Sequence, residues 1–203
     1  MRRIKLGAAT LNQTPLDWHG NEQRILRAIE QAREHAVGLL CLPEMAIPGY
    51  GCQDTFHSMD VLSRSWEMLE RIIPRTHGIA VAIGLPVLTG AAVYDAVALL
   101  VNGSLVGIGA KRHLAGDGVH YEPRWFKPWP VGGRSFAEHA EGQVPLGDFI
   151  FELSGVRVGF EICEEAWVAD RPGADLARLG VDVVLGFGIA LVRVLVGLVV
   201  LAP

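Results

Sequence analysis

Three side chains that could act together on a carbon–nitrogen bond each stand directly after an apolar, strand-like run of this 203-residue chain. They are Glu44, Lys111 and Cys163. If the three runs are strands, their ends could bring a carboxylate, an amine and a thiol to one edge of a sheet. That set is the minimum needed to break an amide through a thioester intermediate.

Each of these side chains has a role in such a reaction. A free thiol has a pKa near ~8.5, so Cys163 needs a base or a positive neighbour before it can attack an amide carbon. Glu44 could take the thiol proton, return it to the leaving ammonia and then activate water. Lys111 could hold the oxyanion of the tetrahedral intermediate. Taken singly, a loop Glu, a surface Lys and a buried Cys are ordinary structural residues, so only the surrounding motifs favour catalysis.

Composition and charge narrow the class of protein. Half of the residues are hydrophobic and the net charge is -4, which indicates one globular domain and argues against a nucleic-acid partner. Three cysteines without metal-ligand spacing favour a reduced, cytoplasmic setting. We expect no metal, since the loop residues His113, Asp117 and His120 are more typical of solvated side chains than of ligands.

Hydrophobic periodicity predicts alternating strands and helices, interrupted by hairpins. Asn102-Gly103 and Ser154-Gly155 are turn sequences that predict two of these hairpins. The pattern therefore indicates an α/β fold with a mixed rather than a purely parallel sheet. We expect helices at 21–36, 59–76 and 175–179, and strands at 4–11, 38–42, 79–85, 97–101, 105–108, 149–153, 156–162 and 181–185.

The last residues differ from the rest. Residues 183–202 are almost entirely aliphatic, and about 20 apolar residues can span a bilayer. Arg193 argues against a membrane span, since a central arginine costs roughly 2.5–3.5 kcal/mol on insertion scales. We expect a domain over residues 1–185, ending in a buried strand, and an atypical aliphatic tail over residues 186–203.

The reactive residues lie in motifs that resemble the nitrilase superfamily, the carbon–nitrogen hydrolases with a Glu-Lys-Cys triad. The resemblance is closest to the glutaminase domain of glutamine-dependent NAD synthetases, and it covers residues 1 to about 185 in family order. It rests on Leu-Pro-Glu-Met followed by Pro-Gly-Tyr-Gly-Cys at 42–52, on Lys-Arg-His-Leu at 111–114 with Tyr-Glu-Pro-Arg-Trp-Phe at 121–126, and on Glu-Ile-Cys-Glu-Glu-Ala-Trp at 161–167.

This resemblance implies an α-β-β-α sandwich. It implies that Cys163 is the nucleophile, Glu44 the base, Lys111 the oxyanion partner, Glu122 a supporting carboxylate and Tyr50 a residue near the glutamine pocket. The domain would hydrolyse glutamine and pass ammonia to a synthetase domain that uses ATP and deamido-NAD. Assembly into a homo-oligomer is also implied.

Two departures from the family shape the expectation. The family continues after the 181–185 strand with an Asn-Pro-Ser-Ala-Ser type segment, where this chain has its aliphatic tail, and no Ser-Gly-Gly-x-Asp-Ser phosphate loop is present. We therefore expect a C-terminally incomplete sandwich that needs no cofactor itself, with ATP and deamido-NAD bound only by the missing synthetase domain. A stand-alone amidase acting on another small amide, and an inactive truncated fragment, remain the alternatives.

Overall fold

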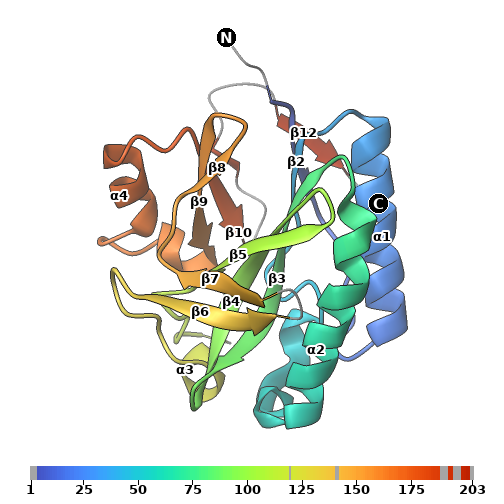
Figure 1. Ribbon diagram of the computed structural model, residues 1–203. Helices are drawn as coiled ribbons and strands as arrows, with labels where there is room; N and C mark the ends of the chain where they lie inside the picture. Colours follow the sequence, from blue (N-terminus) through green and yellow to red (C-terminus); the bar gives the residue numbers. More distant parts are fainter. Residues whose placement is uncertain (1–3, 119, 140–141, 188–191, 194–197, 202–203) are drawn as a thin grey trace.

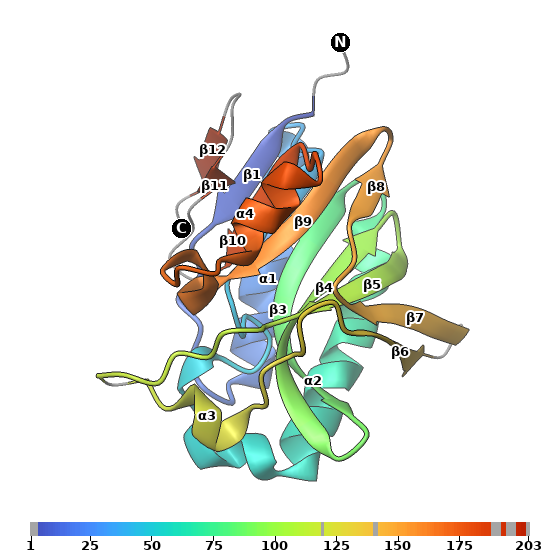
Figure 2. The same ribbon diagram turned by 90° about the vertical axis from the view of Figure 1, so that its left-hand side faces the viewer.

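Two β-sheets face each other and carry helices on their outer sides, so the chain forms four layers (Figures 1 and 2). The computed structural model describes residues 4–118, 120–139, 142–187, 192–193 and 198–201. Helices α1 (Trp18–Glu34) and α2 (Met59–Ile72) cover the larger sheet, and α4 (Pro172–Arg178) covers the smaller one. The predicted α/β sandwich with mixed sheets is confirmed.

The larger sheet has eight strands in the order β12-β1-β2-β3-β4-β5-β7-β6. Strands β12, β1, β2 and β3 are mutually parallel, β3-β4-β5 are antiparallel, β5 and β7 are parallel, and β7 and β6 are antiparallel. Their bounds are β1 Leu6–Ala9, β2 Leu39–Cys41, β3 Ala80–Thr89, β4 Ala92–Val101, β5 Ser104–Ala110, β6 Arg134–His139, β7 Gly142–Gly147 and β12 Leu198–Leu201.

The smaller sheet has the order β11-β10-β9-β8, with β10 parallel to β9 and both outer strands antiparallel to their neighbours. Its strands are β8 Phe151–Leu153, β9 Val156–Ile162, β10 Val183–Phe187 and β11 Val192–Arg193. Short helical segments fill the connections: η1 Tyr50–His57, η2 Ile73–Thr76, α3 Glu122–Trp125 and η3 Cys163–Ala166.

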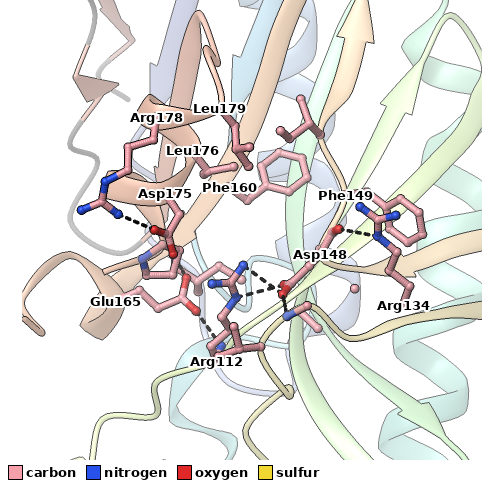
Figure 3. Close-up of a pocket in the computed structure, with 18 of the residues that line it drawn as sticks. Arg112, Arg134, Asp148, Phe149, Phe160, Glu165, Asp175, Leu176, Arg178 and Leu179 are labelled. Carbon is pink, nitrogen blue, oxygen red and sulfur yellow. Dashed lines mark hydrogen bonds and ion pairs between the residues drawn. The ribbon is translucent and has the colours of Figure 1, made fainter. Parts of the chain in front are cut away.

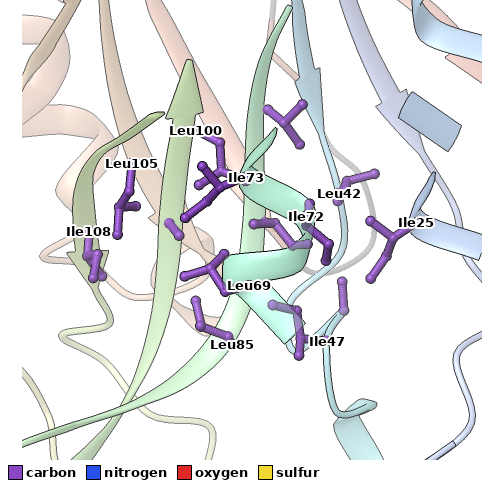
Figure 4. Close-up of a cluster of buried hydrophobic side chains, with 14 of the residues drawn as sticks. Ile25, Leu42, Ile47, Leu69, Ile72, Ile73, Leu85, Leu100, Leu105 and Ile108 are labelled. Atoms are coloured by element: carbon purple, nitrogen blue, oxygen red, sulfur yellow. The ribbon is translucent and has the colours of Figure 1, made fainter. Parts of the chain in front are cut away.

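Side chains of the central strands alternate between two hydrophobic cores. In β2, Leu40 points toward α1 and α2, whereas Leu39 and Cys41 point toward the smaller sheet, as the two-residue period of a strand requires. Figure 4 shows the first core, in which Ile25 of α1 and Leu69 of α2 pack on the larger sheet. Between them the two cores fix the larger sheet from both sides.

The structure differs from the prediction in three places. Strands β3 and β4 have ten residues each and form a hairpin that turns at Gly90. The prediction began the second strand at residue 97 and therefore missed residues 92–96 of β4. The β6–β7 hairpin was not predicted at all. The α-helix expected to reach residue 76 ends at Ile72, because Pro74 cannot donate the next helical hydrogen bond and the chain continues as η2.

The aliphatic tail lies only partly within the described residues. Strand β10 extends to Phe187, β11 pairs with β10, and β12 lies parallel to β1 with Leu198 opposite Leu6. A domain boundary at residue 185 stays a prediction. Within the described part of the chain, no helix is both long and apolar enough to cross a membrane.

Candidate active site

The three predicted reactive residues come together, although they come from both sheets. Glu44 follows β2 and Lys111 follows β5 in the larger sheet, whereas Cys163 follows β9 in the smaller sheet. The Nζ atom of Lys111 lies 2.6 Å from Oε1 of Glu44, and the electrostatic field of Glu44 reaches the Cys163 thiol. The expected meeting at one sheet edge is thus a meeting between two facing sheets.

Lys111 is fully buried among three carboxylates. Its Nζ atom lies 2.6 Å from Glu44, 2.7 Å from Glu122 and 3.4 Å from Asp95. Burial alone lowers the pKa of a lysine, but the charges of Asp95, Glu44 and Glu122 outweigh it and raise the pKa of Lys111 above its ordinary value. The amine is therefore a permanent positive charge. These carboxylates could also surround a metal ion, but the ammonium lies among their oxygens, and the expectation of no metal stays a prediction.

Asp95 is the residue of this cluster that the sequence analysis missed. It lies on β4 with only 1% of its surface exposed, and neither of its carboxyl oxygens accepts a hydrogen bond from a described residue. Burial, followed by the charge of Glu44, raises the pKa of Asp95 well above its ordinary value. A lone acid within the run Val-Tyr-Asp-Ala-Val-Ala-Leu-Leu-Val at 93–101 was the available signal.

Glu122, the expected supporting carboxylate, binds Lys111, and Tyr50 binds Glu122. Glu122 begins α3 and is fully buried; it accepts hydrogen bonds from Lys111, from the Ala115 backbone N–H at 2.8 Å and from the Tyr50 hydroxyl at 2.6 Å. Burial and this bond to Glu122 raise the pKa of Tyr50, so its phenol stays protonated. The Tyr50 hydroxyl also lies 3.2 Å from Nδ1 of His120.

Cys163 occupies a strained turn at the end of β9. Its φ of 45° lies in the left-handed region that a residue with a Cβ rarely adopts, and such strain is concentrated at functional sites. Burial, followed by the charge of Glu44, raises the pKa of the thiol to about 12. The thiol is therefore protonated at rest, so it must give its proton to a base before it can attack.

Glu165 ties the lysine segment to the cysteine segment. One of its oxygens accepts the backbone N–H of Arg112 at 2.5 Å, and the other accepts the N–H of Ile162 at 2.6 Å. These donors are the immediate neighbours of Lys111 and Cys163. Burial raises the pKa of Glu165 to about 7. Nothing in the sequence predicted this contact, because it joins backbone groups from distant parts of the chain.

The raised pKa of Glu165 predicts a pH-dependent stability. A carboxyl whose folded-state pKa exceeds its unfolded value contributes stability at low pH and loses it as pH rises through the folded pKa. Between about pH 4.5 and 7 the wild-type free energy of unfolding should fall by up to about 3 kcal/mol relative to that of Glu165→Gln. Urea unfolding of both proteins across this range measures the effect, and a constant difference would contradict it.

The loop that carries Glu44 is held by buried polar contacts and by a glycine. Asn21 of α1 is buried and donates to the carbonyl of Ile47 at 3.1 Å. Gly84 of β3 lies directly beneath the loop: a Cβ at this position would stand 2.4 Å from the Met45 nitrogen and 2.8 Å from the carbonyl carbon of Glu44. Only glycine lets the loop approach β3 this closely.

Replacing Gly84 with alanine should therefore displace Glu44. We expect Gly84→Ala to lower the free energy of unfolding by about 1–3 kcal/mol, and amide hydrolysis to fall more steeply than the population of folded protein. Gly116→Ala is a matched control, because a Cβ there meets its nearest neighbour, Pro123, at an ordinary 3.5 Å. Urea unfolding and turnover of both variants test the prediction, and equal behaviour would contradict it.

An open hollow of about 710 Å³ lies behind the Glu165 contact, between β5, β9 and α4 (Figure 3). Arg112 and Glu165 reach it from the site, and Arg178 borders it from α4. Arg112 pairs with Asp148 at 2.9 Å, and Arg178 pairs with Asp175 at 2.6 Å. Glu44, Lys111 and Cys163 do not line this hollow, so it is distinct from the reactive cluster.

Comparison with known proteins agrees with this geometry. The carbon-nitrogen hydrolase family model matches residues 5–195. The glutamine-dependent NAD(+) synthetase of Saccharomyces cerevisiae is 37% identical over 191 residues, and the putative one of Schizosaccharomyces pombe is 34% identical over 194 residues. These alignments cover 89% and 90% of this chain.

Two solved structures superpose on this chain. A glutamine-dependent NAD(+) synthetase from Cytophaga hutchinsonii superposes with a TM-score of 0.83 at 39% identity, covering 90% of this chain and 30% of that one. An amidase from Nesterenkonia sp. superposes with a TM-score of 0.69 at 21% identity, covering 90% of this chain and 64% of that one, and shares the fold.

The chain spans 27% and 28% of the length of the two yeast relatives. Within that span, the family match, the sequence identity and the four-layer fold agree. This chain belongs to the carbon–nitrogen hydrolase family and is homologous to the glutaminase part of glutamine-dependent NAD synthetases.

Proposed function

We propose that this chain hydrolyses the side-chain amide of glutamine through a thioester on Cys163. The observation that carries the proposal is the convergence of a protonated thiol, the carboxylate of Glu44 and the buried ammonium of Lys111. A nucleophile, a base and a fixed positive charge are the groups that acyl transfer from an amide requires.

The first half of the reaction forms the thioester. Glu44 takes the proton of the Cys163 thiol, and the sulfur attacks the carbon of the glutamine side-chain amide. The amide oxygen becomes an oxyanion, which the ammonium of Lys111 stabilises. The tetrahedral intermediate then breaks its carbon–nitrogen bond while Glu44 gives the proton to the leaving nitrogen, so that ammonia departs.

The second half regenerates the thiol. A water molecule gives a proton to Glu44 and attacks the thioester carbon, and Lys111 again stabilises the oxyanion. The carbon–sulfur bond breaks, glutamate leaves and the proton returns from Glu44 to Cys163. One carboxylate thus serves as base and acid in both halves, which the interactions of Glu44 with both the amine and the thiol support.

Glu122 and Tyr50 support this reaction by orienting its main groups. Glu122 accepts a hydrogen bond from the ammonium of Lys111, which Glu44 also binds, and it accepts a backbone N–H as well. Tyr50 donates to Glu122, which fixes the phenol near the expected glutamine pocket.

The homologous proteins extend the proposal beyond this chain. We propose that the ammonia is used by a synthetase domain for the ATP-dependent amidation of deamido-NAD, and that this part needs no cofactor of its own. A cytoplasmic setting and homo-oligomeric assembly belong to the same proposal. The relatives' names and the chain's coverage of about a quarter of their length support it.

The test is ammonia release by the purified chain from glutamine and from short aliphatic amides, measured side by side. Selective release from glutamine supports the proposed function. Faster turnover of short amides would favour a stand-alone amidase. No release from a folded chain with any amide would favour an inactive fragment.

A further inference from the structure

The cluster around Lys111 contains more negative charge than one amine can balance. Glu44, Asp95 and Glu122 would together carry three negative charges against the single positive charge of Lys111. All four groups are buried, and a buried charge without a partner is costly. One of the carboxyls is therefore expected to hold a proton.

The geometry identifies which carboxyl this is. Two of the three N–H donors of Lys111 are directed at Glu44 and Glu122, at 2.6 and 2.7 Å. Asp95 lies at 3.4 Å without a hydrogen bond from the amine, and its oxygens accept none from other described residues. Glu122 has three donors, so its negative charge is well compensated, whereas that of Asp95 would not be.

We propose that Asp95 is protonated at neutral pH and donates its proton in a hydrogen bond to Glu44, which makes it a positioning residue for the base. This inference rests on the proposed function only for its catalytic consequence. The Asp95 carbonyl accepts the backbone N–H of Lys111 at 2.9 Å, so the strand holds the carboxyl against the cluster. Carboxyl oxygens of Asp95 and Glu44 lie within 4.8 Å of each other, and the interaction with Glu44 adds to the rise in the pKa of Asp95.

Among the described residues, the charged groups that act on Asp95 are those of this cluster. Lys111 approaches it from the end of β5, Glu44 from the loop after β2 and Glu122 from α3. On β3, the non-titratable Pro86 stands opposite it. Farther out, the cluster is bordered by Cys163, Tyr50 and Glu165, which interact with its members.

This arrangement keeps the charge of the site constant during the reaction. With Asp95 neutral, Lys111 is balanced by Glu122, and Glu44 carries the one remaining negative charge. When Glu44 takes the thiol proton, that charge moves to the sulfur of Cys163 and no further charge accumulates. With Asp95 ionised, a second uncompensated negative charge would oppose formation of the thiolate.

The protonation state can be measured without any substrate. We would label the aspartate carboxyl carbons of the full chain with ¹³C and record their chemical shifts against pH. We expect one aspartate to remain in the acid form at about pH 7, where an ordinary aspartate is ionised. That signal should vanish in Asp95→Asn and persist in Asp60→Asn, which removes an exposed carboxyl of α2. Ionisation of every aspartate at neutral pH would overturn the proposal.

Two variants test the positioning role. Asp95→Asn retains a neutral donor, so kcat for glutamine should fall by less than about tenfold with KM unchanged, and the loss of activity at alkaline pH caused by Asp95 ionisation should disappear. Asp95→Leu removes the donor, and kcat should fall by about 100-fold or more at the same KM. Equal losses in the two variants, with both folded by circular dichroism, would show that the negative charge matters and would overturn the proposal.

The two experiments separate this inference from the proposed function. A protonated Asp95 in a chain that releases no ammonia would refute the function and leave the inference standing. An ionised Asp95 in a chain that hydrolyses glutamine would refute the inference and leave the proposed function standing.

Discussion

Cys163→Ala should reduce ammonia release from glutamine to the background of the assay. The variant keeps Glu44 and Lys111 in place but has no atom that can form the thioester, and loss of a nucleophile from a catalytic set typically costs about 10³-fold or more. An enzyme-coupled ammonia assay on the purified wild type and variant measures the effect.

Cys41→Ala is the matched control, because it deletes a thiol of the same size from the core between the sheets. Its specific activity per folded molecule should equal that of the wild type. Retention of glutamine hydrolysis by Cys163→Ala would exclude a thioester at this position and with it the proposed mechanism.

Lys111→Met should both abolish hydrolysis and destabilise the fold. The methionine fills a similar volume but leaves the carboxylates of Glu44 and Glu122 buried without a positive partner. Removing one partner of a buried charge cluster costs about 3–5 kcal/mol of unfolding free energy. Lower pH should reduce the difference in unfolding free energy between the variant and the wild type, because protonation of the carboxylates then compensates for the lost positive charge.

Urea unfolding at neutral and mildly acidic pH measures this effect. Lys127→Met is the control: Lys127 is exposed, and its replacement should change the free energy of unfolding by less than about 0.5 kcal/mol. A Lys111→Met protein as stable as the wild type at neutral pH would show that the carboxylates do not depend on the amine.

The sequence predicted the main parts of the site because each lies next to a strong local signal. Glu44, Lys111 and Cys163 follow short apolar runs that a few residues suffice to identify as strands. The motifs around them occur in the same order as in the family. The structure brings them together with Glu122 and Tyr50, and their catalytic roles stay predictions.

Asp95 and Glu165 were not predicted because their roles depend on distant neighbours. Asp95 lies in the half of β4 that the predicted boundaries left unassigned, so its inward direction could not be read. Glu165 acts through two backbone N–H groups, and a backbone group carries no residue-specific signal.

The missed β6–β7 hairpin has a similar physical cause. In residues 134–139 the covered side of the strand carries Ser135, Ala137 and His139, whereas Phe136 on the other side is 57% exposed. A strand with two polar residues on its covered side and a phenylalanine on its exposed side leaves little hydrophobic periodicity in the sequence. Its place in the sheet is set by its antiparallel pairing with β7 instead.

The three cysteines differ in exposure, so thiol labelling can measure the fraction of folded molecules in a preparation. Cys41 and Cys52 are buried, whereas Cys163 is only partly covered, so a reagent in solution can reach only the Cys163 sulfur while the chain is folded. A thiol reagent applied to the native chain should therefore incorporate one equivalent per intact molecule, and three after unfolding. The ratio of the two would count the competent sites in any preparation, so that a rate constant can be assigned to active molecules rather than to total protein.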